Sequence, residues 1–214
     1  MSSVAVIDYG MGNLRSVSKA LEHVSPDATV HVTNDAKIIA EADRVVFPGV
    51  GALRDAMHEL KRLSLDSLIK QLVTEKPFLG VCLGMQALFD FSEENDGCEG
   101  LGILPGNVCY FGHDRADKET KQRLKVPHMG WNILQQTEDH PMWHGIAADS
   151  RFYFVHSYYV EAKDNTHVAG VCDYGGKFCA AVSAPNIFAA QFHPEKSQAL
   201  GLRILDNFMQ WNGE

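Results

Sequence analysis

The sequence has little positive charge. Lysine and arginine total 19 residues, against 27 aspartate and glutamate residues in a chain of 214, and the formal net charge is −8. A nucleic-acid-binding protein usually carries a basic stripe instead. The stretch richest in lysine and arginine, residues 115–125, is interrupted by Asp117 and Glu119 and is typical of a solvated segment. The composition therefore argues against a nucleic-acid partner, and residues 114–125 are assigned no role.

Long apolar runs and paired cysteines are also missing. No segment approaches the ~18 consecutive apolar residues of a membrane-spanning helix, and the first three residues lack the basic charge that begins a secretory signal. The five cysteines include no C-x-x-C pair, so neither a disulfide framework nor a zinc ribbon is indicated. We therefore expect a cytoplasmic protein with reduced thiols, no membrane partner and no metal.

The first half of the chain alternates strand-like and helix-like segments. Helical spacing is clear at Leu53, Met57 and Leu60, which recur at i, i+4 and i+7. Apolar runs typical of buried strands occupy residues 4–7 and 78–81, residues 44–47 carry Val45 and Val46, and residues 29–32 are a short β-branched piece. Such an alternation predicts an α/β fold with a mostly parallel sheet covered by helices.

The second half is richer in short β-like pieces. They occupy residues 131–134, 152–155, 168–171 and 188–191, and a last helix is marked by Leu202, Leu205, Phe208 and Met209. We expect these pieces to add antiparallel or mixed strands to the sheet. With no repeat or long linker, residues 1–214 are predicted to form one domain, with its chemistry at the carboxyl ends of strands.

A nucleophile is predicted at Cys82. The sequence Gly-Val-Cys-Leu-Gly at residues 80–84 follows an apolar strand and precedes an expected helix over 85–91, as in the strand-turn-helix nucleophile elbow. The glycines leave room for a strained turn, the Leu83 N–H can donate to an oxyanion, and a helix N-terminus favours a thiolate. The other four cysteines lack this context and are interpreted as structural.

A cysteine nucleophile needs a base and a group that orients it. His193 follows the β-rich run 187–191, and Glu195 stands two residues further on. In an extended chain, side chains at i and i+2 project to the same side, so the carboxylate is expected to reach the imidazole. His156 is a rival base without such a carboxylate, and we interpret it as a wall of the same pocket.

Two glycine-containing loops are candidates for contacts with a ligand. Residues 48–51, Pro-Gly-Val-Gly, can bring backbone N–H groups close to a ligand, although a tight turn would use the same residues. Gly10 and Gly12 suggest a dinucleotide-binding loop, but Arg15 stands where G-x-G-x-x-G needs its third glycine. We therefore expect no dinucleotide cofactor.

Taken together, residues 80–86 and 193–195 resemble the class I (triad) glutamine amidotransferases. Within that class, the blocks at 8–14, 48–51, 127–132 and 193–197 resemble the glutaminase subunits of imidazole glycerol phosphate synthases, which act in histidine biosynthesis. The resemblance extends over nearly the whole chain. Met85, where most of the class has histidine, and the block 127–132 discriminate best.

This resemblance implies a flavodoxin-like three-layer α/β fold, with helices on both faces of the sheet. It implies that Cys82 forms a glutamyl thioester, that His193 transfers protons, and that Glu195 orients His193. The oxyanion would be held by the N–H groups of Leu83 and Val50, after a rearrangement of the 48–51 loop. The residues implied to bind glutamine are Gly49, Gly51, Gln86, Glu94, Tyr153, Ser157 and Tyr158.

The implied partner is a (β/α)₈-barrel cyclase subunit, which Lys196 would face in a heterodimer. Ammonia would pass through the barrel to a bound ribulosyl aminoimidazole carboxamide nucleotide, and this chain would need no cofactor. The open alternatives are a paralogous amidotransferase subunit feeding a different synthase, such as one for sugar amidation, and a stand-alone cysteine hydrolase. A non-catalytic binding subunit is less consistent with a complete Cys-His-Glu set.

Overall fold

A parallel five-stranded sheet forms the centre of the protein. The computed structural model describes residues 2–112, 114–117 and 119–214. The strand order in this part of the sheet is β2-β1-β3-β4-β13, and all four pairings are parallel. The strands are β1 (Ser3–Ile7), β2 (Thr29–Thr33), β3 (Arg44–Gly49), β4 (Phe78–Cys82) and β13 (Ile187–Ala190). This order is that of the flavodoxin-like doubly wound fold, which confirms the predicted fold class.

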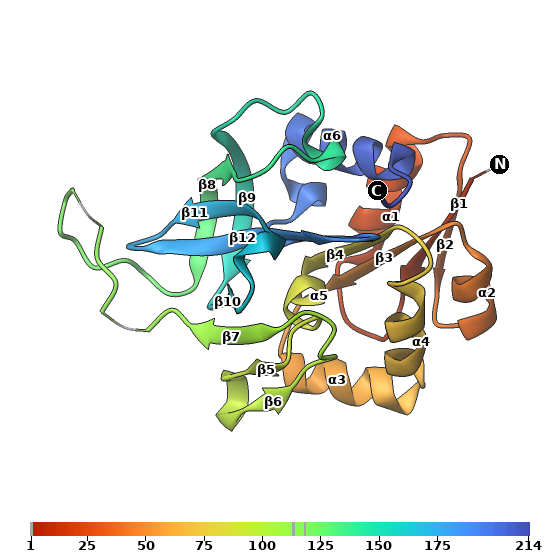
Figure 1. The fold of residues 1–214 in the computed structure, drawn as a ribbon, viewed down its shortest axis with the longest axis horizontal. Helices are drawn as coiled ribbons and strands as arrows, with labels where there is room; N and C mark the ends of the chain where they lie inside the picture. Colours follow the sequence, from red (N-terminus) through yellow and green to blue (C-terminus); the bar gives the residue numbers. More distant parts are fainter. Residues whose placement is uncertain (1, 113, 118) are drawn as a thin grey trace.

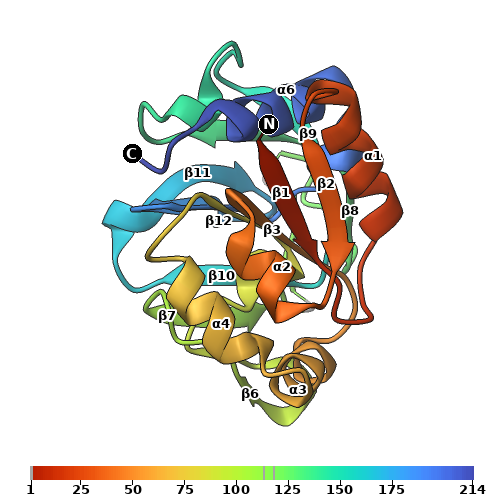
Figure 2. The ribbon, with the colours of Figure 1, turned by 90° about the vertical axis from the view of Figure 1, so that its right-hand side faces the viewer.

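Helices cover both faces of this sheet and make it the middle of three layers (Figures 1 and 2). One face carries α1 (Leu14–Val24) and α6 (Gln198–Gln210), and the other carries α2 (Ala36–Glu41), α3 (Leu53–Arg62) and α4 (Leu65–Leu72). Alternate residues of a strand enter opposite cores: Val4 and Val6 pack with α1 and α6, whereas Ala5 and Ile7 pack with α2, α3 and α4. Burial on both faces explains the apolar runs of β1, β3, β4 and β13, whereas the edge strand β2 is partly exposed.

The second half extends the sheet with antiparallel strands. Beyond β13 the order continues β12-β10-β7-β5-β6, while β11, β8 and β9 branch from β12. Figure 1 shows this extension beside the parallel part. Its strands are β5 (Phe91–Ser92), β6 (Cys98–Glu99), β7 (Gly106–Tyr110), β8 (His128–Gln136), β9 (Ser150–His156), β10 (Tyr158–Ala162), β11 (Val168–Asp173) and β12 (Lys177–Ala184). The expected antiparallel additions are therefore present, and β13 itself pairs parallel with β4 and antiparallel with β12.

The structure corrects two element boundaries expected from the sequence and adds one helix. The helix after Cys82, α5, covers only Leu83–Gln86, because the carbonyls of residues 87–89 accept hydrogen bonds from the N–H groups of 101–103 instead of continuing a helix. Strand β3 continues through Pro48 and still pairs there with β4. Its pairing with β1 has already ended at Val46, so the absence of an N–H on proline breaks no hydrogen bond between β1 and β3. Helix α2 was not predicted, although the Asp35 side chain caps it by accepting from two backbone N–H groups.

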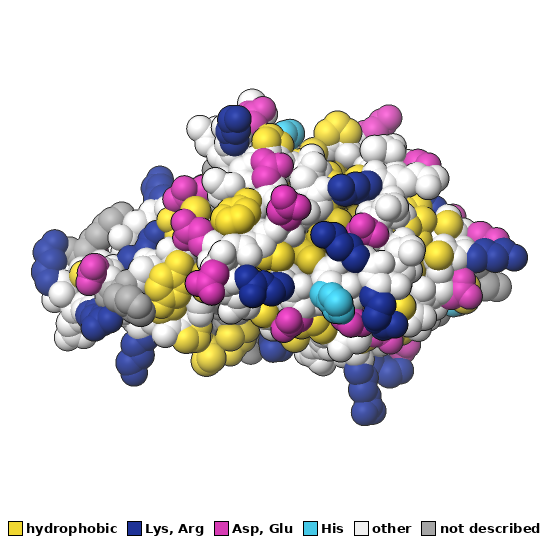
Figure 3. All heavy atoms as spheres, turned by 90° about the horizontal axis from the view of Figure 1, so that it is seen from below, with side chains coloured by type: hydrophobic (Ala, Val, Ile, Leu, Met, Phe, Trp, Pro, Cys, Tyr) yellow, Lys and Arg dark blue, Asp and Glu magenta, His cyan; other side chains and the backbone are white. Residues whose placement is uncertain are grey.

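Three general expectations concern the surface, the thiols and membrane spans. Lysine and arginine side chains are interspersed with aspartate and glutamate on the face shown in Figure 3. All five cysteines are free thiols. Among the residues the structure describes, no helix is long and apolar enough to cross a membrane.

Candidate active site

The predicted nucleophile, base and oxyanion loop meet at one edge of the parallel sheet. Strands β3, β4 and β13 are neighbours, and their carboxyl ends lie together. Gly49 at the end of β3 pairs with Cys82 at the end of β4, and Ala190 at the end of β13 pairs with Val81. The residues that follow these strand ends therefore surround Cys82 from two sides.

Cys82 has the strained backbone expected of a nucleophile elbow. Its φ is 55° and its ψ is −109°, an arrangement that non-glycine residues rarely adopt. The flanking glycines are needed because the chain is crowded: a Cβ on Gly84 would collide with the Phe47 carbonyl oxygen, and one on Gly80 would lie 2.9 Å from the Ala189 Cβ. The strain is held by the packed sheet and turns the Cys82 side chain toward a cavity while leaving it only 7% exposed.

His193 and Glu195 form the predicted pair, through a different local geometry from the one we expected. The His193 Nδ1 lies 2.9 Å from the Glu195 Oε1, and both side chains are almost fully buried. The link between them is a 3₁₀ turn over Pro194–Lys196, not an extended chain. His193 itself is fixed by its own N–H, which donates to the Tyr153 carbonyl, and by its carbonyl, which accepts from the Ser197 hydroxyl.

The electrostatics of this pair suit a proton-transfer group. Burial lowers the pKa of His193, but the Cys82 sulfur and the Glu195 carboxylate outweigh burial and raise the pKa to about 10. The other ring nitrogen, Nε2, is buried without a hydrogen-bond partner among the described residues. An unsatisfied buried nitrogen is costly, and such a nitrogen is free to exchange a proton with a neighbouring group.

A cavity of about 320 Å³ opens above Cys82. Its wall includes eight residues that the sequence predicted as nucleophile, oxyanion donors or substrate contacts. His156, which was expected to be a wall of the pocket, also lines it. The eight are Val50, Gly51, Cys82, Leu83, Gln86, Glu94, Ser157 and Tyr158. The volume lies within the range of small-molecule sites. The fold thus brings together most of the predicted substrate residues from four separate segments.

The loop after β3 is closely packed under the nucleophile. Gly49 is buried, and a Cβ there would collide with the Tyr9 hydroxyl and lie 2.9 Å from the Leu83 Cβ. Gly51 has a φ of +96°, which glycine adopts without strain. Val50 between them is 37% exposed and lines the cavity. Glycine at position 49 therefore permits the close approach of this loop to the elbow, and glycine at position 51 permits its positive φ.

Gln86 and Glu94 are held in place by hydrogen bonds to the protein. The Gln86 amide donates to the Tyr158 carbonyl at 3.0 Å and to the Gln191 Oε1 at 2.9 Å. The Glu94 carboxylate accepts from the first N–H of helix α3, at Leu53, over 2.7 Å. Both side chains are thus oriented before any ligand arrives, with Glu94 contributing a negative charge to the wall of the cavity.

Among the residues predicted to contact substrate or partner, Gly49, Tyr153 and Lys196 do not line the cavity. The Tyr153 ring packs at 6.1 Å from Trp131 and at 6.0 Å from the Lys196 ammonium group, and Tyr153 and Lys196 contribute nothing to the cavity wall. Alternation along β9 explains this, because Phe152 and Phe154 point into the core and Tyr153 points to the opposite side. The structure therefore places Tyr153 beside Lys196, and its link to the triad is through its backbone.

Sequence reasoning missed a buried histidine pair. His128 Nδ1 lies 2.9 Å from His156 Nε2, and His156 Nδ1 lies 2.8 Å from the Tyr158 carbonyl. Burial lowers the pKa of His128 to about 4 and is the main cause that lowers the pKa of His156 to about 3, so both are neutral near pH 7. A carbonyl only accepts, so His156 carries its proton on Nδ1 and His128 donates to its Nε2. His156 is therefore not a base but a fixed wall.

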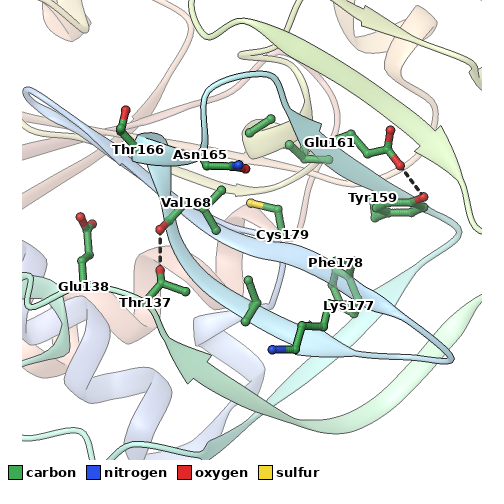
Figure 4. Close-up of a pocket in the computed structure, with 13 residues that line it drawn as sticks. Thr137, Glu138, Tyr159, Glu161, Asn165, Thr166, Val168, Lys177, Phe178 and Cys179 are labelled. Atoms are coloured by element: carbon green, nitrogen blue, oxygen red, sulfur yellow. Dashed lines mark hydrogen bonds between the residues drawn. The ribbon is translucent and has the colours of Figure 1, made fainter. Parts of the chain in front are cut away.

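A larger cavity of about 740 Å³ lies on the antiparallel extension, between β10, β11 and β12 (Figure 4). Several of its polar side chains are already hydrogen-bonded: the Thr137 hydroxyl donates to the Val168 carbonyl, and the Tyr159 hydroxyl donates to Glu161 at 2.8 Å. No triad residue lines it. In the described parts of the chain, no group of three or more histidine, cysteine, aspartate or glutamate residues could hold a metal.

Comparisons with known proteins agree with this geometry. The family model for glutamine amidotransferase class-I matches residues 5–211. The imidazole glycerol phosphate synthase subunit HisH of Pseudomonas syringae is 55% identical over 213 residues, covering 100% of this chain and 99% of that protein. The protein of the same name from Nitrosococcus oceani is 57% identical over the same coverage.

Solved structures are similar at the level of the fold. A structure described as a glutamine amidotransferase superposes with a TM-score of 0.71 at 16% identity, covering 97% of each chain. A chain of PurLQS from Thermotoga maritima gives a TM-score of 0.69 at 18% identity, covering 98% of this chain and 96% of that one. With the family model and the full-length relatives, the chain belongs to the class I glutamine amidotransferases, and within them to the HisH subunits of imidazole glycerol phosphate synthase.

Proposed function

We propose that Cys82, His193 and Glu195 hydrolyse glutamine to glutamate and ammonia, and that residues 1–214 form one glutamine amidotransferase domain that passes the ammonia to a (β/α)₈-barrel cyclase. One observation carries the proposal. The strained Cys82 and the buried His193–Glu195 pair lie at neighbouring strand ends beneath a cavity lined by the predicted glutamine residues. No metal or organic cofactor takes part in this scheme.

The first half of the reaction forms a thioester. The Cys82 sulfur attacks the side-chain amide carbon of glutamine, and the negative oxygen of the tetrahedral intermediate is held by the N–H groups of Leu83 and Val50. His193, held in one orientation by Glu195, gives its proton to the departing nitrogen, so that ammonia leaves as the C–N bond breaks. The cationic form that Cys82 and Glu195 favour on His193 is the form needed for this step.

The second half restores the enzyme. His193 removes a proton from water, the resulting hydroxide attacks the thioester carbon, and the C–S bond breaks to release glutamate. Glu195 stabilises the imidazolium that forms and is not itself protonated. For the sum of the two halves, glutamine and water give glutamate and ammonia, with Cys82 unchanged.

Recognition of the amino-acid end of glutamine falls to the opposite wall of the cavity. The Glu94 carboxylate suits the substrate ammonium group, and the segment of Ser157 and Tyr158 offers polar groups to the carboxylate. Both amide hydrogens of Gln86 are already used, so its Oε1 is the atom that faces the substrate as an acceptor. Gly51 forms part of the remaining wall, and Gly49 lies buried next to it in the same loop.

The partner face lies on β8 and the turn after His193. Apolar side chains at alternate positions of β8, Met129, Trp131 and Ile133, are exposed by 62%, 44% and 39%. All three line one surface groove. The Trp131 ring packs against Tyr153, and the Tyr153 ring lies next to the Lys196 ammonium group. A contiguous exposed apolar strip of this kind is typical of a protein interface, and we assign it to the cyclase, with Lys196 as a charged contact.

This face gives a prediction for assembly. Trp131→Ala should weaken binding of the cyclase subunit by at least about tenfold, because exposed tryptophans at interfaces often carry much of the binding energy. Isothermal titration with the purified cyclase would measure this. Phe91→Ala is the matched control, since Phe91 is a similarly exposed aromatic residue (42%) on β5, away from β8. Equal loss in both variants would contradict the assignment of this face.

The decisive experiment measures glutamate release from glutamine by this chain alone, and with the barrel cyclase plus its nucleotide ligand. We expect low release alone and strong activation in the complex. High release that the cyclase leaves unchanged would point to a stand-alone hydrolase. Activation by a different synthase only would identify a paralogous amidotransferase subunit.

A further inference from the structure

Gln191 reaches the nucleophile through its side chain, and neither the triad nor the substrate set includes it. It directly follows β13, beside the end of β4, and it is completely buried. Its Nε2 lies 3.6 Å from the Cys82 sulfur, within hydrogen-bonding range for sulfur. A buried amide aimed at a catalytic sulfur is a feature that the established triad chemistry does not explain.

The orientation of this amide is fixed by a chain of hydrogen bonds. The chain starts at the Tyr158 carbonyl, which can only accept, so Gln86 must present its NH₂ group there. The same Gln86 NH₂ group donates to Gln191 Oε1 at 2.9 Å, and this leaves Gln191 with its NH₂ toward the sulfur. His156 Nδ1 also donates to the Tyr158 carbonyl, which fixes the anchor of the chain.

We propose that Gln191 is a positioning residue that donates a hydrogen bond to the Cys82 sulfur, holds its rotamer toward the cavity, and stabilises the thiolate over the thiol. The proposal rests on the function assigned above to Cys82. An N–H donor stabilises an anionic acceptor more than a neutral one, so this contact favours the attacking form. As a further consequence, Gln86 at the substrate wall is linked to the nucleophile through the side chain of Gln191.

The test uses two substitutions at one position. Gln191→Met keeps the volume but removes both donor and acceptor, whereas Gln191→Glu keeps an acceptor for Gln86 and puts a carboxylate in place of the donor. Cys82 alkylation by iodoacetamide would be followed across pH by peptide mass mapping, which separates Cys82 from the other four cysteines. Glutaminase kcat and KM would be measured in the complex with the cyclase.

We expect the pH of half-maximal Cys82 alkylation to rise by about one unit in Gln191→Met, and further in Gln191→Glu, because a donor to the anion is lost. The kcat should fall about tenfold, with KM little changed. Gln136→Met is the matched control, because Gln136 donates its amide to the Ile146 carbonyl far from Cys82, and its alkylation profile should equal that of the wild type.

A folded Gln191→Met protein with an unchanged alkylation profile and unchanged kcat would overturn the proposal. A loss of thermal stability with the pH profile unmoved would also overturn it, because that pattern belongs to a purely structural glutamine. The alkylation measurement needs only Cys82 and no cyclase. It therefore separates a failure of this inference from a failure of the proposed glutaminase function, in which the complex would release no glutamate even with Gln191 intact.

Discussion

Cys82→Ala should abolish glutamine-dependent synthesis by the complex while ammonia-dependent synthesis continues at the wild-type rate. Removing the sulfur removes the thioester route altogether, and losing a catalytic nucleophile typically costs on the order of 10⁶-fold in kcat. The cyclase reaction itself needs only ammonia, which can be added to the solution. The two activities would be measured on the same preparation, with glutamine or with an ammonium salt as the nitrogen source.

The substitution is mild for the fold. Cys82 is 7% exposed and its sulfur borders a cavity, so a methyl group fits the space that it leaves. Retained binding of the cyclase is the control for folding. Loss of ammonia-dependent synthesis together with the glutamine-dependent activity would contradict the model in which this subunit supplies ammonia and the partner uses it.

His193→Ala should reduce glutaminase kcat by roughly 10⁴- to 10⁶-fold. Glu195→Ala should have a smaller effect, and its kcat should stay roughly ten to a hundred times higher than that of His193→Ala. His193 exchanges protons with the reacting atoms, whereas Glu195 acts through the 2.9 Å contact with His193 Nδ1. The order of the two effects follows from this difference in role. Steady-state kinetics in the complex with the cyclase would measure both variants.

Glu195→Gln provides the matched control for this prediction. It keeps an acceptor at 195 but removes the negative charge, which is one of the causes that raise the pKa of His193 to about 10. We expect His193, which must be protonated for ammonia release, to have a lower pKa in this variant. The alkaline limb of the pH profile of kcat should therefore shift to lower pH. Equal loss in His193→Ala and Glu195→Ala, with folding intact, would show that the roles are misassigned.

Much of the fold and the site follows from patterns that are local in the sequence. Apolar runs predicted the central parallel strands β1, β3 and β4 because these strands are buried on both faces. The elbow was recognisable because Gly80, Cys82 and Gly84 meet one local demand, a strained turn between strand and helix. The length of α5 was not predictable, because residues 101–103 end it from far along the chain.

The pairing of His193 with Glu195 was predictable as a contact, but its geometry was not. A spacing of two residues brings the side chains together in an extended strand, and a 3₁₀ turn does so here. The position of Tyr153 depended on the facing of β9, which a single strand-like run leaves open until its neighbours are known. For this reason Tyr153 was expected in the cavity and lies instead beside Lys196.

The sequence by itself predicted the nucleophile, the base and the orienting carboxylate from motifs of a few neighbouring residues, and the α/β class from the alternation of strand-like and helix-like segments; the flavodoxin-like class followed from the resemblance to a family. Only the tertiary structure decided that Gln191 contacts the Cys82 sulfur, that His128 donates a hydrogen bond to His156, and that Gln86 bridges the substrate wall to Gln191. These contacts join residues 28 to 109 positions apart. They depend on which strands become neighbours and in what register, and no local spacing records that choice.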